Sequence, residues 1–125
     1  MSHKKKRKKK GQKKMSNTAV ISVVTLDITP MMPGYPMYYV KAEADFTLPT
    51  GVGASFIYGT AKFIDTTSGT QLGATTMHED VPGHATMTPQ AYNLTPGNVL
   101  KAEVTVSWVE EPKTSAPKST TKTIP

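Results

Sequence analysis

The residues best suited to chemistry lie in the segment MHEDVPGH, which brings His78, Glu79, Asp80 and His84 close together in the sequence. Imidazole and carboxylate groups are the usual ligands of transition metals and the usual partners in acid–base catalysis. A metal site would also need a third well-placed ligand, an open geometry and supporting polar groups, and the hydrophilic character of the segment does not indicate any of them. We therefore interpret the segment as a solvated turn between two strands that holds no metal ion.

Other signatures of catalysis are missing from the sequence. The absence of cysteine excludes a disulfide scaffold, thiolate catalysis and zinc–thiolate sites. The chain has no Gly-x-Ser-x-Gly motif, no phosphate-binding loop and no paired carboxylates with separate roles. The sequence therefore predicts no catalytic residue, no cofactor and no enzymatic activity.

The charges are strongly segregated along the chain. Residues 15–111 hold three lysines and all nine acids, 3 − 9 = −6, and residues 112–125 add three lysines. Residues 1–14 hold nine basic residues and no acid: Lys4, Lys5, Lys6, Arg7, Lys8, Lys9, Lys10, Lys13 and Lys14. We therefore divide the chain into a basic arm, residues 1–16, and an acidic domain, residues 17–125.

The arm should bind an anionic partner. Like charges without apolar residues do not fold alone, and fourteen extended residues reach roughly 45 to 50 Å. Three partners compete: an acidic protein assembly such as a capsid lattice, nucleic acid bound without sequence specificity, and an import receptor for which KKKRK resembles a nuclear localisation signal. A solubilising tail, or translation that starts at Met15, is the remaining alternative.

Targeting and membrane segments are not expected. The apolar run AVISVV after the arm is too short for a secretory signal, and no small-residue cleavage site follows it. No stretch approaches the ~18 apolar residues of a membrane span. The sequence therefore predicts no membrane partner.

Two segments show the alternation of a strand with one buried face. Residues 38–48 and residues 100–108 each place apolar side chains at every second position and polar or charged ones between them. The predicted inward side chains are Tyr38, Val40, Ala42, Ala44, Phe46 and Leu48 in the first and Leu100, Ala102, Val104, Val106 and Trp108 in the second.

Weaker strand patterns precede and follow these two. Residues 18–29 are rich in Val and Ile on both faces, as in a strand at a sheet edge or one that switches sheets. Residues 55–64 place Ile57, Ala61 and Phe63 on one side. A turn at DTTSGT then leads into a strand at residues 71–77.

The last part of the chain continues in the same way. Residues 85–94 predict a strand that Pro89 restricts to an edge or a bulge, because proline cannot donate to the ladder. Residues 112–118 predict a flexible Pro/Ser/Lys-rich loop, and STTKTI predicts a short last strand.

One loop combines prolines with methionines and tyrosines. The segment TPMMPGYPMYY contains Met31, Met32, Tyr35 and Met37, which could form a stiff apolar tip that binds a partner. The alternative is a Pro-rich loop that folds over the end of the domain and caps its core.

The pattern of six or seven short strands predicts an all-β, antiparallel immunoglobulin-like β-sandwich. Residues 92–106, YNLTPGNVLKAEVTV, resemble the corner between strands E and F of fibronectin type III and related immunoglobulin-like modules. Leu100 stands where the family usually has an aromatic residue, so the tyrosine-corner hydrogen bond is not expected.

The resemblance implies a fold and no particular activity. With the acidic domain and the basic arm, it favours a non-catalytic structural protein similar to the capsid decoration proteins of bacteriophages, located in the virion. The same charges allow the arm of one copy to lie on the acidic domain of its neighbour. The alternative is a nucleic-acid-binding protein of the nucleus or nucleoid.

Overall fold

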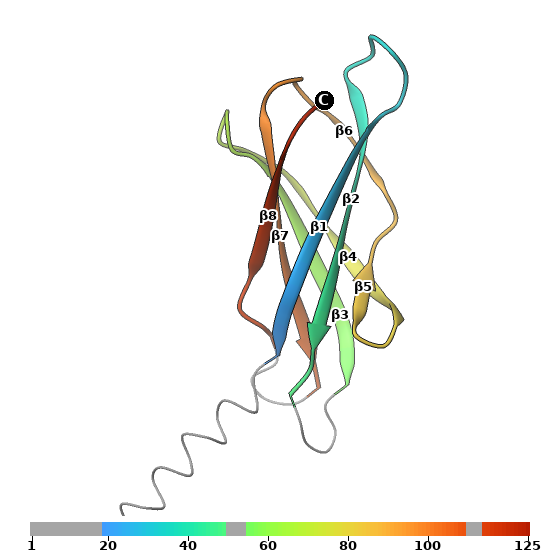
Figure 1. The fold of residues 1–125 in the computed structure, drawn as a ribbon, viewed down its shortest axis with the longest axis vertical. Helices are drawn as coiled ribbons and strands as arrows, with labels where there is room; N and C mark the ends of the chain where they lie inside the picture. Colours follow the sequence, from blue (N-terminus) through green and yellow to red (C-terminus); the bar gives the residue numbers. More distant parts are fainter. Residues whose placement is uncertain (1–18, 50–54, 110–113) are drawn as a thin grey trace, which may run out of the picture.

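The computed structural model describes residues 19–49, 55–109 and 114–125, and these residues form eight β-strands (Figure 1). They are β1 (Val20–Pro30), β2 (Met37–Thr47), β3 (Phe56–Asp65), β4 (Thr70–Val81), β5 (His84–Thr86), β6 (Gln90–Asn93), β7 (Val99–Trp108) and β8 (Lys118–Thr123). The predicted all-β class is confirmed. Within the described ranges there is no helix of the length and hydrophobicity needed to cross a membrane.

The strands form two packed layers joined by β4. Their hydrogen-bonded order is β1-β2-β5-β4-β3-β7-β8, with β6 also paired to β2, and every pairing is antiparallel. The first part of β4 pairs with β3 in one layer, and its last residues pair with β5 in the other. The sandwich is thereby closed along one side.

The core lies between the layers, where the two alternating segments face each other. Leu100, Ala102, Val104, Val106 and Trp108 of β7 are completely buried. The predicted inward residues of β2 are also buried, and Leu48, just beyond the end of β2, is half-buried. Full burial of a Val, Leu or Phe side chain stabilises the fold by about 1.5 to 3 kcal/mol. The period of two in the sequence therefore predicts this part of the core correctly.

A β-bulge explains why β1 has apolar residues on both faces. The register with β2 shifts between Ile21 and Val23. The shift changes the alternation, so that Ile21 and Val24 are buried while Val20 and Val23 are exposed. The mixed pattern is thus one strand with an extra residue.

A second bulge makes one prediction wrong. The register of β3 with β7 shifts between Phe56 and Tyr58, and Ile57 is 53% exposed. Ala61 and Phe63 are fully buried as expected, but the bulge turns Ile57 outward. A bulge cannot be read from a simple count of alternate positions.

Pro89 divides the stretch of residues 85–94 into two strands, which is why there are eight strands and not seven. It lies between β5 and β6, outside both ladders. The expectation of an edge or bulge is wrong for β5, which pairs with β2 on one side and with β4 on the other.

Three Pro-Gly pairs in the described residues make tight turns. They are Pro33-Gly34, Pro82-Gly83 and Pro96-Gly97, and the glycine φ angles are 75°, 83° and 90°. Proline followed by a residue with positive φ is the signature of a type II turn. The turn at Pro82-Gly83 connects β4 directly to β5.

Candidate functional site

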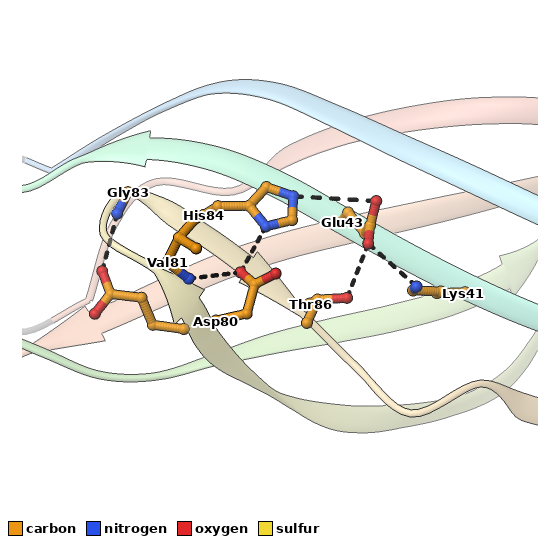
Figure 2. Close-up of polar contacts among 8 residues, drawn as sticks. Lys41, Glu43, Asp80, Val81, Gly83, His84 and Thr86 are labelled. Atoms are coloured by element: carbon orange, nitrogen blue, oxygen red, sulfur yellow. Dashed lines mark hydrogen bonds and ion pairs between the residues drawn. The ribbon is translucent and has the colours of Figure 1, made fainter.

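The β4–β5 hairpin brings together Asp80 and His84, two of the four histidines and acids of the segment MHEDVPGH. Val81 pairs with His84 across the Pro82-Gly83 turn, which returns the chain beside β4. His84 Nδ1 then lies 2.6 Å from Asp80 Oδ1, and the same oxygen accepts a hydrogen bond from the Val81 amide at 2.9 Å (Figure 2). The predicted solvated turn is therefore shorter than expected, because His78, Glu79 and Asp80 belong to the strand.

The other two residues of the segment point to different partners. Glu79 Oε2 accepts a hydrogen bond from the amide of Gly83 at 3.0 Å and so supports the turn. His78 pairs in register with Thr86 and is exposed. The four residues therefore do not converge on one point.

A carboxylate from β2 completes the cluster around His84. Glu43 Oε1 lies 4.0 Å from His84 Nε2, and Glu43 Oε2 accepts a hydrogen bond from Thr86 Oγ1 at 3.0 Å (Figure 2). Lys41 Nζ lies 3.2 Å from the same oxygen. The sequence marked Glu43 only as outward-facing, and its meeting with His84 depends on the pairing of β2 with β5.

The protonation equilibria of these residues are coupled. The hydrogen bond with Asp80 raises the pKa of His84 above its ordinary value of 6.5, and the same bond lowers the pKa of Asp80 below 3.8. Burial alone would raise the pKa of Glu43, but the hydrogen bonds from Thr86 and Lys41 outweigh it and lower the pKa. The cluster therefore favours an imidazolium held between two carboxylates.

This arrangement is suited to a clasp between strands. Both ring nitrogens of His84 face carboxylates, so neither is directed at a substrate. In the described part of the chain, no three His, Cys, Asp or Glu side chains converge as metal ligands. A pocket of about 110 Å³ beside His84 is lined by acidic, aliphatic, hydroxyl and imidazole groups, from Val23, Thr25, Glu43, Ala44, Asp45 and His84.

The Met/Tyr/Pro loop lies at the opposite end of the sandwich from the β4–β5 turn (Figure 1). Met31, Met32 and Tyr35 are 37%, 55% and 50% exposed, and Met37 is half-buried at the start of β2. The Met31 amide donates to Met37 O at 3.1 Å, and the Tyr35 amide donates to Met32 O at 3.2 Å. The backbone of the loop is therefore fixed while its apolar side chains face solvent.

The loop is also joined to the neighbouring corner of the domain. The Leu94 amide donates to Pro36 O at 2.9 Å. A pocket of about 250 Å³ between the loop and the corner is lined by Gly34, Tyr35, Pro36, Tyr38 and Pro96. This end of the molecule thus presents aromatic and proline rings on a firm support.

The predicted arm residues lie outside the described part of the chain, together with residues 112 and 113 of the predicted flexible loop. The following residues are tied to β7. Thr114 forms a β-bridge with Ser107, and the buried Ser115 accepts a hydrogen bond from the Val106 amide at 3.0 Å.

The corner between β6 and β7 is tied to the last residues of the chain. Leu100, which opens the buried face of β7, is fully buried. The Gly97 amide donates to Ile124 O at 2.9 Å, and the Ile124 amide donates to Asn98 O at 2.8 Å. The end of the chain therefore supplies hydrogen bonds that hold this corner.

These strands define an antiparallel immunoglobulin-like β-sandwich with two loop-bearing ends. Two crystal structures of Parabacteroides merdae β-glucuronidase, one of them with glycerol in the active site, resemble it with a TM-score of 0.62 and 13% sequence identity. The likeness covers 85% of this chain and 14% of theirs, and it concerns the fold alone. No protein-family model matches the chain, and no curated protein sequence matches it.

Proposed function

We propose that this protein is a non-catalytic structural protein whose basic arm grips an anionic partner and whose sandwich projects away from that partner. Its most concrete form is a capsid decoration protein, made in the host cytoplasm and bound to the acidic surface of a virion. This form rests on analogy with other small immunoglobulin-like modules. The charge of the arm and the arrangement of the fold supply the physical argument for a structural protein that binds through its arm.

The direction of β1, which begins next to the arm and ends at the Met/Tyr/Pro loop, is the observation that carries the proposal. The arm precedes Val20 at one end of β1, and the loop follows Pro30 at the other end. The strand has 11 residues, which at roughly 3.3 Å each separate its ends by on the order of 36 Å. The arm is therefore joined to the domain at the end opposite the apolar loop.

The charge of the domain favours a protein over nucleic acid as that partner. Residues 15–111 carry a net charge of 3 − 9 = −6, so the domain repels both kinds of partner, and it repels a duplex more strongly because phosphates carry one charge per roughly 1.7 Å of helix axis. The described acids include Asp27, Glu43 and Asp45 on the outer face of β1 and β2, where one lysine, Lys41, lies among them. Nucleic-acid binding through the arm is the alternative function.

A binding comparison tests the proposal. Full-length protein is titrated with poly-L-glutamate and with a DNA duplex of equal charge concentration at about 150 mM salt. We expect polyglutamate to bind and DNA to bind at least tenfold more weakly. A variant with all nine basic residues of 4–14 changed to serine should lose both interactions, because salt-dependent binding requires the cations.

The opposite order of affinities would replace the proposal with its alternative. Tighter binding of DNA by the full-length protein would mean that the acidic domain does not oppose nucleic acid. Retention of polyglutamate binding by the serine variant would remove the arm from the function altogether. The paired change Met32→Thr and Tyr35→Thr serves as the control, since it leaves every cation in place.

A further inference from the structure

Exposed apolar side chains gather at the end of the sandwich where the arm joins the domain. Among the described residues ten large hydrophobic side chains are exposed, and four of them belong to the Met/Tyr/Pro loop and its neighbour Tyr39. The other six lie where β1 and β3 begin and where β4 and β7 end: Val20, Val23, Ile57, Tyr58, Val81 and Val109. These strand ends form the lower end of the molecule in Figure 1, which we call the arm end.

Three register shifts lie beside Val23, Ile57 and Val81 of this group. They lie between Ile21 and Val23, between Phe56 and Tyr58, and between Glu79 and Val81. Each is followed or spanned by an exposed apolar residue, and uninterrupted alternation would have turned Ile57 inward. Bulges that redirect side chains are frequent at functional edges of sheets.

We propose that the arm end is the docking surface for a second copy of this chain. Two arm ends meet across a twofold axis, and the arm of each copy crosses to the acidic domain of the other. The same patch then serves both copies, as a closed symmetric dimer requires. The inference rests on the arm being the gripping segment of the proposed function.

Charge complementarity selects a second copy as the occupant. Asp45, Glu79 and Asp80 are exposed near the arm end, beside the apolar side chains. A foreign acidic surface can be held by the arm while the sandwich projects away from it, but in direct contact with the arm end it would meet these carboxylates with like charge, as would the phosphates of nucleic acid. A second copy instead brings its own nine arm cations to them at the place where its arm begins.

The dimer depends on both kinds of contact. A standard interface uses about 20 to 30 residues on each side, whereas the arm end offers six large apolar side chains. The apolar contact alone is therefore weak, and the arms must supply the rest in a form that salt screens. Because an arm cannot grip two surfaces at once, an anionic partner competes with the second copy.

Sedimentation of the full-length protein tests the inference. At about 100 μM protein and 50 mM salt we expect a dimer, and at about 500 mM salt a dissociation constant raised at least tenfold. The paired change Ile57→Thr and Val109→Thr should raise the dissociation constant at low salt by at least tenfold. These side chains are exposed and threonine remains β-branched, so the fold should persist, which thermal melting verifies.

Matched measurements separate this inference from the proposed function. Met32→Thr with Tyr35→Thr, at the other end of the sandwich, should leave the dimer unchanged. A monomer at 100 μM, or a dimer that only the loop variant weakens, would overturn the docking surface. Polyglutamate binding by the Ile57→Thr and Val109→Thr variant should persist in either case, because its arm is intact.

Discussion

The side-chain amide of Asn98 donates a hydrogen bond to Asp65 Oδ2 at 2.9 Å and so links the turn after β3 to the turn before β7. The other carboxylate oxygen of Asp65 accepts hydrogen bonds from the amides of Thr67 and Ser68 at 3.0 and 3.1 Å. Asp65 is only 7% exposed. One buried carboxylate thus organises two loops at the end of the sandwich that also carries the Met/Tyr/Pro loop.

Removal of this carboxylate should destabilise the domain. We expect Asp65→Ala to lower the free energy of unfolding by about 2 kcal/mol, because hydrogen bonds to a charged acceptor are lost and Asn98 is left without its partner. Urea unfolding, followed by the fluorescence of the single buried Trp108, measures the change. Asp27→Ala, at an exposed position of β1, should have little effect on the free energy of unfolding. Equal losses of stability in the two variants would contradict the stabilising role of the Asp65 hydrogen bonds.

The same carboxylate predicts a dependence of stability on pH. The hydrogen bond from Asn98 is the largest influence on Asp65 and lowers its pKa below the ordinary 3.8. A group with a depressed pKa in the folded state contributes stability that is present above its unfolded pKa. That contribution is lost as the pH falls through the folded pKa.

A comparison with Asp65→Asn isolates this contribution. The free energy of unfolding of the wild type minus that of the variant should be constant above about pH 5 and should shrink below pH 4. The subtraction is needed because Glu43 and Asp80 also have lowered pKa values and contribute to the acid sensitivity of the wild type. If the difference in free energy of unfolding does not change between pH 6 and pH 2, protonation of Asp65 is not coupled to folding.

His84 should show the opposite dependence on pH. Its hydrogen bond with Asp80 raises its pKa above 6.5, so its stabilising contribution is present below pH 6.5 and lost as the pH rises through the folded pKa. NMR titration of the imidazole should give a pKa above 6.5 for the wild type. Asp80→Asn should lower that pKa, while Lys41→Met, which removes a cation and leaves Asp80 in place, should not.

The parts of the fold that the sequence predicts are those governed by the chemistry of adjacent residues. The alternation in β2 and β7 identifies their buried faces because every second side chain points to the same side. The positions of Ile57 and Val23 are not predictable in this way. A bulge is a property of the ladder between two strands, and a single strand does not show it.

The contacts of the candidate site are likewise predictable only where the residues are close in the sequence. The sequence separation of Asp80 and His84 is short, so their proximity can be anticipated once Pro82-Gly83 is recognised as a hairpin turn. Glu43 comes from a strand more than thirty residues earlier, and its contact with His84 is fixed only by the register of β2 with β5. Asp65 and Asn98 are likewise separated by 33 positions.

Two glycines provide a matched test of the turn geometry. Gly69 and Gly83 both have positive φ, +77° and +83°, where an L-residue is strained by about 1 to 2 kcal/mol. A Cβ at Gly69 would meet nothing within 4 Å, but a Cβ at Gly83 would lie 3.2 Å from Phe46 O. The Phe46 backbone cannot yield easily, because it pairs with Ile21 of β1 and its amide donates to Gly83 O at 2.9 Å.

We therefore expect Gly83→Ala to cost more stability than Gly69→Ala, by about 1 kcal/mol beyond the shared backbone strain. Urea unfolding monitored by Trp108 compares the two variants under identical conditions. The difference has a structural consequence, since the Gly83 turn places His84 beside Asp80. The Gly83→Ala variant should accordingly also show a lower His84 pKa by NMR, whereas Gly69→Ala should leave that pKa unchanged. Equal destabilisation of the two variants, with an unaltered His84 pKa in both, would show that the close approach to Phe46 O adds no cost to the backbone strain.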